Sequence, residues 1–82
     1  MVEVKFKEEF KRAFSKIKDN LAKEKIIKKV QKIKFNPEVG KPMRNVRKGT
    51  RELYIKPFRL SYFYDLKENT VYILDLYHKK KQ

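Results

Sequence analysis

The sequence predicts an α+β domain in which a short N-terminal strand and a helical hairpin precede a three-stranded antiparallel meander, with both helices on one face of the sheet. Two observations support this fold class. Apolar residues recur every three or four positions in the first half of the chain, which is the period of an amphipathic helix. After Gly49, three runs rich in β-branched, aromatic and leucine residues are separated by short breaks, as in strands joined by hairpins. The 82 residues are expected to form one domain, 1–82, with a small core.

The N-terminal segment predicts a strand followed by a helix. Apolar and charged residues alternate from Val2 to Phe6, which is the pattern of a short strand. The helix is expected from about Lys7 to Lys18, because the apolar residues of this region fall on one helical face. These residues are Phe6, Phe10, Ala13, Phe14, Ile17 and Leu21.

A second helix is expected after the polar break at Asp19 and Asn20, with Asn20 as its N-cap. It should end near Phe35, because Asn36 precedes Pro37 and is therefore disfavoured in the helical region. Its apolar stripe consists of Ile26, Ile27, Val30 and Ile33. Since each helix has only one apolar face, both are expected to pack on the sheet.

The segment from Asn36 to Lys48 predicts a loop, because it contains Pro37, Gly40 and Pro42. Its second half is strongly basic, with Arg44, Arg47 and Lys48.

Three antiparallel strands are expected at about Thr50–Lys56, Phe58–Leu66 and Thr70–His78, with the N-terminal strand at one edge of their sheet. Pro57 fixes its own φ in the first turn, and Asn69 tolerates a positive φ in the second. The alternation of the first of these strands places two sets of side chains on opposite faces. One set is Arg51, Leu53 and Ile55, and the other is Glu52, Tyr54 and Lys56. The continuously apolar run from Val71 to Leu74 suits an interior strand.

The composition excludes several classes of protein. The chain has no cysteine and one histidine, so no disulfide, thiolate metal site or His-rich metal site is expected, and no cofactor is implied. No apolar run approaches the roughly 20 residues of a membrane span, and the first residues lack the apolar region of a signal peptide. We therefore expect a soluble cytoplasmic protein.

The net charge of +13 predicts a polyanionic partner. A strong positive field attracts phosphates and speeds association with nucleic acid. A lysine-rich surface of the kind found in thermophiles is the alternative, but that surface raises acids together with bases. Most lysines of the two helices are expected to form solvated faces, and the alternative is a second contact surface for RNA.

Five short motifs resemble the RelE/ParE superfamily, the toxins of type II toxin–antitoxin systems, and are most similar to its RelE or HigB mRNA-interferase branch. The motifs are Gly40–Met43, Gly49–Leu53, Phe58–Tyr62, Val71–Leu74 and His78–Lys80. The expected order of strand, two helices and three strands also matches this superfamily, so the resemblance covers nearly the whole chain and implies a RelE-like fold.

The resemblance implies a function and partners. RelE and HigB members are ribosome-dependent, metal-free endoribonucleases that cut mRNA and so inhibit translation, and a cognate RelB-like antitoxin neutralises them. ParE members instead poison DNA gyrase. The sequence leaves three alternatives open: an mRNA endoribonuclease, a ParE-type gyrase inhibitor, and a non-catalytic basic module that binds nucleic acid.

The same resemblance implies catalytic roles. Arg59 occupies the position of the family's arginine and would stabilise negative charge on the phosphorane, because its planar fork binds two phosphate oxygens. Lys79 occupies the position of a basic residue after the last strand. Founding members carry two catalytic lysines where this chain has Glu52 and Tyr54, and the terminal tyrosine of RelE is missing after Gln82.

Further candidates follow from the residue types. His78 is a candidate general acid or base, because its ordinary pKa lies near neutrality, and Tyr54 is a candidate catalytic or stacking residue. Asp75 lies in an apolar strand and needs a partner, either in a salt bridge with a nearby Arg or Lys or as the residue that orients a catalytic cation. The RNA-binding candidates are Lys56, Lys80, Lys81, Arg51, Tyr77, Arg44, Arg47 and Lys48.

Two of these positions carry a structural expectation as well. Arg51 shares its face with Leu53 and Ile55, which favours a structural role for it. Arg59 alternates with Phe58 and Leu60 and is therefore expected on the face opposite the core, where truncation would cost little stability.

Overall fold

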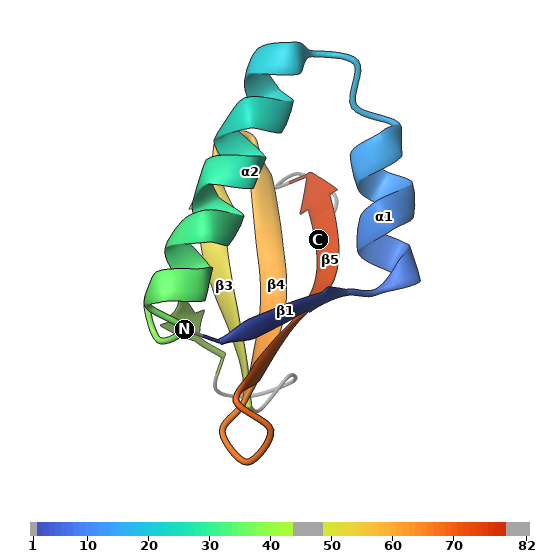
Figure 1. The fold of residues 1–82 in the computed structure, drawn as a ribbon. Coiled ribbons are helices and arrows are strands. Elements are labelled where there is room, and N and C mark those ends of the chain that lie inside the picture. The colour runs from blue at the N-terminus through green and yellow to red at the C-terminus, as the bar shows by residue number, and fades with distance from the viewer. Residues whose placement is uncertain (1, 44–48, 79–82) are drawn as a thin grey trace.

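The computed structural model describes residues 2–43 and 49–78, and within them it confirms the predicted fold class. A five-stranded mixed sheet carries two helices (Figure 1). The elements are β1 (Glu3–Phe6), α1 (Glu8–Ser15), α2 (Asn20–Phe35), β2 (Lys41–Pro42), β3 (Thr50–Ile55), β4 (Phe58–Asp65) and β5 (Thr70–His78).

The sheet has the strand order β1-β5-β4-β3-β2. β3, β4 and β5 form the predicted antiparallel meander, and β1 joins its edge by running parallel to β5. β2 is a two-residue edge strand that the sequence did not predict, because it lies within the loop after α2. β4 ends at Asp65, one residue before the expected Leu66, since the Asp65 carboxylate accepts hydrogen bonds from the backbone N–H groups of Lys67 and Glu68. Asn69 has the predicted positive φ, of 51°.

α1 is shorter than the sequence predicts, and α2 has a different N-cap. α1 ends at Ser15 instead of Lys18, where the backbone tightens and the Ile17 N–H donates to the Phe14 carbonyl. The predicted N-cap of α2 is wrong by one residue. Asp19 is the N-cap, because its carboxylate accepts from the Leu21 N–H at 3.0 Å, while Asn20 is already helical. α2 ends at Phe35 as predicted.

The core lies between the sheet and the two helices. Leu60, Tyr62, Val71 and Ile73 of the sheet are fully buried, and they form one cluster with residues of both helices. The helical members of this cluster are Phe10, Ile26 and Ile33. α1 packs over β5 and α2 over β3. No helix among the described residues is both long enough and apolar enough to cross a membrane.

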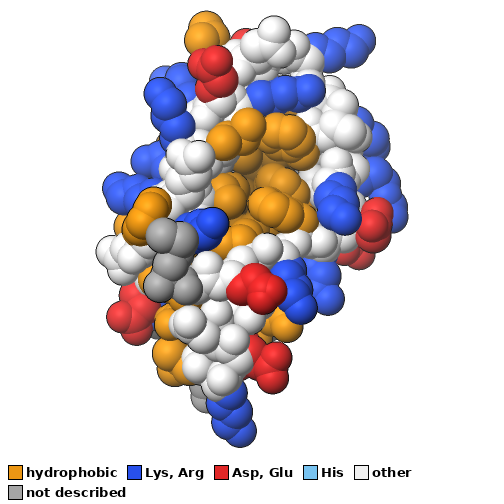
Figure 2. All heavy atoms as spheres, in the orientation of Figure 1, with side chains coloured by type: hydrophobic (Ala, Val, Ile, Leu, Met, Phe, Trp, Pro, Cys, Tyr) orange, Lys and Arg blue, Asp and Glu red, His pale blue; other side chains and the backbone are white. Residues whose placement is uncertain are grey.

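The two helices diverge and leave an apolar groove between them. The groove has a volume of about 280 Å³, and Figure 2 shows hydrophobic side chains gathered in the middle of this face with basic side chains around them. It is lined by Phe6, Phe10, Lys11, Phe14, Ile26, Ile27, Val30 and Gln31. Phe6 and Ile27 remain 41% and 48% exposed, so the helical pair does not bury its own apolar faces completely.

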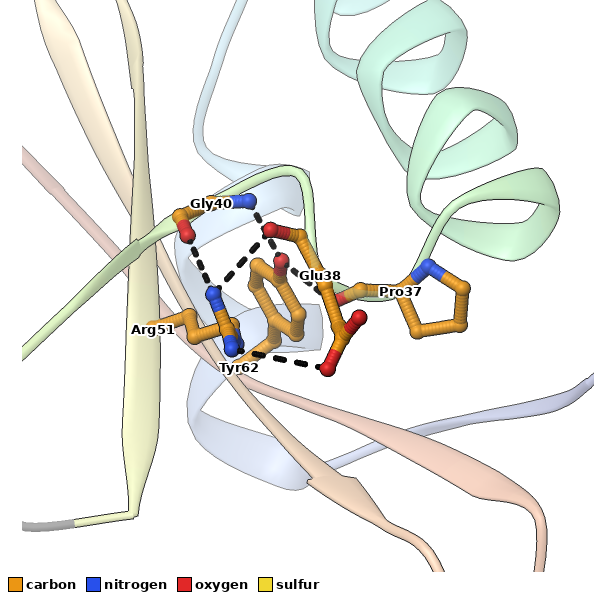
Figure 3. Close-up of polar contacts among 5 residues, drawn as sticks. All are labelled: Pro37, Glu38, Gly40, Arg51 and Tyr62. Carbon is orange, nitrogen blue, oxygen red and sulfur yellow. Dashed lines mark hydrogen bonds and ion pairs between the residues drawn. The ribbon is translucent and has the colours of Figure 1, made fainter.

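A polar anchor ties the loop after α2 to the core face of the sheet (Figure 3). The Tyr62 hydroxyl donates to the Pro37 carbonyl and accepts from the Gly40 N–H, both at 2.8 Å. Arg51 donates to the carbonyls of Glu38 and Gly40, at 3.0 and 2.8 Å, and its guanidinium lies 4.0 Å from the Glu38 carboxylate. A Cβ at Gly40 would lie 2.7 Å from the Tyr62 hydroxyl, so this close approach requires glycine.

We predict that Tyr62→Phe lowers the free energy of unfolding by about 1–3 kcal/mol, because it leaves the buried Gly40 N–H and the Pro37 carbonyl without their partner. Tyr64→Phe is the matched control and should stay within about 0.5 kcal/mol of the wild type. Urea denaturation of the three proteins measures both values. Equal effects of the two substitutions would show that the anchor contributes nothing.

Because Tyr62 is buried, we also expect the stability of the protein to depend on pH. Burial raises the pKa of Tyr62 above its ordinary value of 10.0. Above pH 10.0 the Tyr62 hydroxyl loses its proton in the unfolded chain but keeps it in the folded protein. Deprotonation therefore stabilises the unfolded state, and the contribution of Tyr62 to the free energy of unfolding falls as the pH rises. The stability deficit of Tyr62→Phe should therefore shrink between about pH 8 and pH 11. A deficit that stays constant over this range, measured by denaturation, would contradict the prediction.

Candidate functional site

The register of the meander places three candidate residues in one row. Tyr54 of β3 is paired with Arg59 of β4, which is paired with Tyr77 of β5. Residues directly opposite one another project to the same face of a sheet. The flanking row, Leu53–Leu60–Leu76, faces the core, so the Tyr54–Arg59–Tyr77 row lies on the face away from the helices. Arg59 therefore lies opposite the core, as its alternation predicts.

A β-bulge brings Tyr77 onto this face. Tyr62 pairs with Ile73 while Ser61 pairs with Asp75, so Leu74 is an extra residue in β5. Simple alternation from the buried Ile73 would place Tyr77 on the core face. The extra residue shifts the phase and places Tyr77 on the open face instead.

Glu52 is the centre of the site, although the sequence pattern does not single it out as a site residue. Its side chain is only 8% exposed. One carboxylate oxygen accepts from the Arg59 Nη1 at 3.2 Å, and the other accepts from the Tyr77 hydroxyl. We call Glu52, Arg59 and Tyr77 the carboxylate cluster. The alternation of β3 already indicates that Glu52 and Tyr54 share a face, and this pattern could have marked Glu52 as a site residue. Its contact with Tyr77 could not be foreseen in this way, because it depends on the bulge in β5.

The carboxylate cluster opens into a hollow of about 710 Å³ at the β2 edge. Its lining residues are Lys41, Pro42, Met43, Glu52, Tyr54 and Arg59. Tyr54 is 50% exposed at the rim, and the Arg59 side chain is one-third exposed. A bound molecule could thus meet an arginine and a buried carboxylate that already contact each other.

His78 does not join this hollow. It pairs with Phe58 across the sheet, and their rings meet edge to face with centroids 5.8 Å apart. Both residues line a different hollow, between the end of β5 and the segment from α1 to α2. The structure therefore does not bring His78 and Arg59 together in one hollow, and a catalytic role for His78 stays a prediction.

The other predicted residues have several different positions. Arg51 lies on the core face within the polar anchor, which fits its expected structural role and not the RNA-binding one. Lys56 is exposed at the end of β3 and lines a hollow beside α2. The salt bridges among residues 2–43 and 49–78 do not include Asp75, whose carboxylate accepts from the Leu76 N–H at 2.7 Å. Arg44, Arg47, Lys48, Lys79, Lys80 and Lys81 lie outside the described residues.

The donor set suits an anionic ligand. Residues 2–43 and 49–78 contain no group of three or more histidine, cysteine, aspartate or glutamate side chains that could hold a metal ion. A guanidinium binds phosphate oxygens through a planar fork. A carboxylate beside it can accept a proton, and an exposed tyrosine ring can stack on a base.

The sequence matches the model of one protein family. This family is described as the ParE toxin of the type II toxin–antitoxin system parDE, and the match covers residues 3–82. A comparison with curated proteins found no match.

Solved structures share the fold. A chain of the intact E. coli RelBE toxin–antitoxin complex superposes with a TM-score of 0.83 at 16% identity, with 100% of each chain covered. The YoeB/ParE toxin from Agrobacterium tumefaciens gives 0.83 at 14% identity, covering 94% of this chain and 98% of the toxin. A chain of the RelBE2 toxin–antitoxin complex from Mycobacterium tuberculosis gives 0.68 at 28% identity, covering 94% and 96%.

We predict that Arg59→Ala costs more stability than its position on the open face suggests. The substitution leaves the buried Glu52 carboxylate without its guanidinium, and the free energy of unfolding should fall by about 1–3 kcal/mol. Arg12→Ala, at an exposed arginine of α1, is the control and should change it by less than about 0.5 kcal/mol.

A double variant tests the cause. Adding Glu52→Gln to Arg59→Ala should recover part of the lost stability, because the neutral amide no longer needs a cation. If the two substitutions are additive in denaturation experiments, Glu52 and Arg59 do not stabilise each other.

Proposed function

The chain belongs to the RelE/ParE superfamily of toxins of type II toxin–antitoxin systems, and we propose that it inhibits translation in the cytoplasm as a metal-independent endoribonuclease that cuts mRNA on the ribosome. The observation that carries this proposal is the contact between the Arg59 guanidinium and the buried Glu52 carboxylate, in a hollow that is open to solvent.

The carboxylate cluster supplies the groups that such a reaction needs. In RNA cleavage without a metal, the 2′-oxygen attacks the adjacent phosphorus and the bond to the 5′-oxygen breaks. In this proposal Glu52 accepts the proton of the 2′-hydroxyl. Arg59 is placed to bind two oxygens of the phosphorane, a contribution of roughly 3–4 kcal/mol to the transition state.

Two further residues complete the proposed site. Tyr54 stacks on a base next to the scissile phosphate, which is worth about 1–3 kcal/mol. The departing 5′-oxygen needs a proton, and Lys79, which follows His78 in the sequence, is the candidate to supply it. Tyr77 orients the Glu52 carboxylate through its hydroxyl.

Inhibition of DNA gyrase is the second candidate function. The matching family model is that of ParE toxins, which favours it. Gyrase inhibition requires a surface for a protein partner and no proton transfer at Glu52. The two functions therefore respond differently to substitutions in the carboxylate cluster.

We predict that Arg59→Lys slows mRNA cleavage by roughly two to three orders of magnitude, because a point charge does not replace the planar fork. This variant keeps a cation beside Glu52, so the fold should survive. Arg59→Ala should be at least as impaired at a temperature where circular dichroism shows it folded. Primer extension on ribosome-bound transcripts measures the cleavage.

The same proteins are also tested for inhibition of purified gyrase in a supercoiling assay. Cleavage by Arg59→Lys at the wild-type rate would refute the proposed site. Wild-type inhibition of gyrase without cleavage would establish the second function, and absence of both activities would leave a basic module that binds nucleic acid.

The apolar groove between α1 and α2 supports a protein partner, and we propose that it binds an amphipathic helix of a RelB-like antitoxin. The groove is lined mostly by apolar side chains, with Lys11 among the lining residues. The net charge of +13 favours an acidic partner. Two of the structures that share this fold are themselves toxin–antitoxin complexes.

We predict that Ile27→Glu weakens antitoxin binding at least tenfold, because it places a carboxylate in the apolar groove. The fold should tolerate this change, since Ile27 is 48% exposed. Leu66→Glu, in the turn between β4 and β5, is the matched control and should bind as the wild type does. Isothermal titration with the product of the neighbouring gene gives both affinities, and equal affinities would place the antitoxin elsewhere.

A further inference from the structure

One face of α2 carries a row of four lysines. Lys25, Lys28, Lys29 and Lys32 follow the spacing i, i+3, i+4 and i+7, which places their side chains side by side on a helix. They line a hollow of about 360 Å³ together with the end of β3. The β3 residues there are Tyr54, Ile55 and Lys56. We call this region the lysine hollow.

The charge of the lysine hollow is not balanced within the described chain. The salt bridges of residues 2–43 and 49–78 include none of the four lysines. α2 contains Glu24 as its single acidic residue. Like charges at these spacings destabilise a helix. A solvated face would be expected to alternate acids with bases, so the pattern calls for an anion with several charges.

The lysine hollow and the hollow of Glu52 and Arg59 have one lining residue in common. This residue is Tyr54, whose side chain is half-exposed. A chain of phosphates held by Arg59 could therefore pass Tyr54 at the β3 edge and reach the lysines of α2.

We propose that the lysine hollow binds the phosphate backbone of single-stranded RNA on one side of the phosphate held by Arg59, with Tyr54 stacked on an intervening base. This inference rests on the proposed function, because it extends the substrate contact of the same site. Lysine is a flexible point charge that suits successive phosphates, and an aromatic ring in a basic groove suits unpaired bases.

The geometry favours RNA over an acidic protein segment here. The lysine hollow is formed mostly by cations, whereas the apolar groove uses Ile26, Ile27 and Val30 of the same helix. An amphipathic helix needs the apolar residues, and these lie on the side of α2 that faces α1. The two surfaces of α2 thus fit two different partners.

The test compares two variants with the same change in net charge. In the first, Lys25, Lys28, Lys29 and Lys32 are all replaced by glutamine, which has nearly the same helix propensity. In the control, Lys5, Lys16, Lys18 and Lys67 are replaced, all of them exposed and outside both hollows. Circular dichroism checks the fold of each variant.

The probe is a 2′-O-methyl RNA oligonucleotide, which cannot be cut because it lacks the attacking hydroxyl. Fluorescence anisotropy gives its affinity over a range of salt concentrations. Each lost phosphate contact should reduce the slope of log K against log salt by about 0.7. The first variant should therefore lose up to about 3 units of slope and at least tenfold in affinity, while the control should lose clearly less.

The outcomes separate this inference from the proposed function. Equal losses in the two variants would overturn it, because the effect would then be that of net charge alone. Unchanged RNA binding with lost antitoxin binding would also overturn it and assign the lysines to the protein partner. A selective loss of RNA binding supports it, even if the wild type proves unable to cut mRNA.

Discussion

The polar anchor between the sheet and the loop after α2 is the constraint on which the site depends. Tyr62 and Arg51 hold the backbone of residues 37–40 against the sheet through hydrogen bonds of 2.8–3.0 Å. Because Lys41 follows directly and pairs with Glu52, this anchor fixes β2 along β3. β2 is one wall of the hollow that contains Arg59. The core face of the sheet thus sets the shape of the open face.

The second constraint is the extra residue in β5. If Leu74 followed regular alternation with no bulge, the strand could keep its core residues Val71 and Ile73, but Leu76 would turn away from the core and Tyr77 toward it. The bulge lets β5 contribute Leu76 to the core and Tyr77 to Glu52 at once. Because the bulge absorbs the extra residue, one strand serves the core on one face and the carboxylate cluster on the other.

The difference between local sequence patterns and contacts between distant residues explains what the sequence could predict. The helices, the meander and the face of Arg59 follow from local periodicity, and β5 matched its expected bounds at Thr70–His78. Glu52 was missed as a site residue because its importance comes from Tyr77, 25 positions away, and the bulge hides that pairing from simple alternation. His78 pairs with Phe58 and lies on the face opposite Arg59, a position that residue type alone could not indicate. The Asp19 cap differs from the prediction by one residue, since aspartate and asparagine cap helices about equally well.

Under the proposed function, the two surfaces of α2 determine what an antitoxin has to cover to block cleavage. Its apolar residues face the groove beside α1, and its lysine row faces the edge of β3. A helix bound only in the groove would leave both the lysines and Arg59 open to RNA. An antitoxin could block cleavage by continuing past α2 with an acidic segment, or by distorting the sheet. The first route needs no change in the fold, because the two hollows already share Tyr54. An acidic extension there would compete with the RNA backbone for the same cations, and such competition weakens as salt screens both partners.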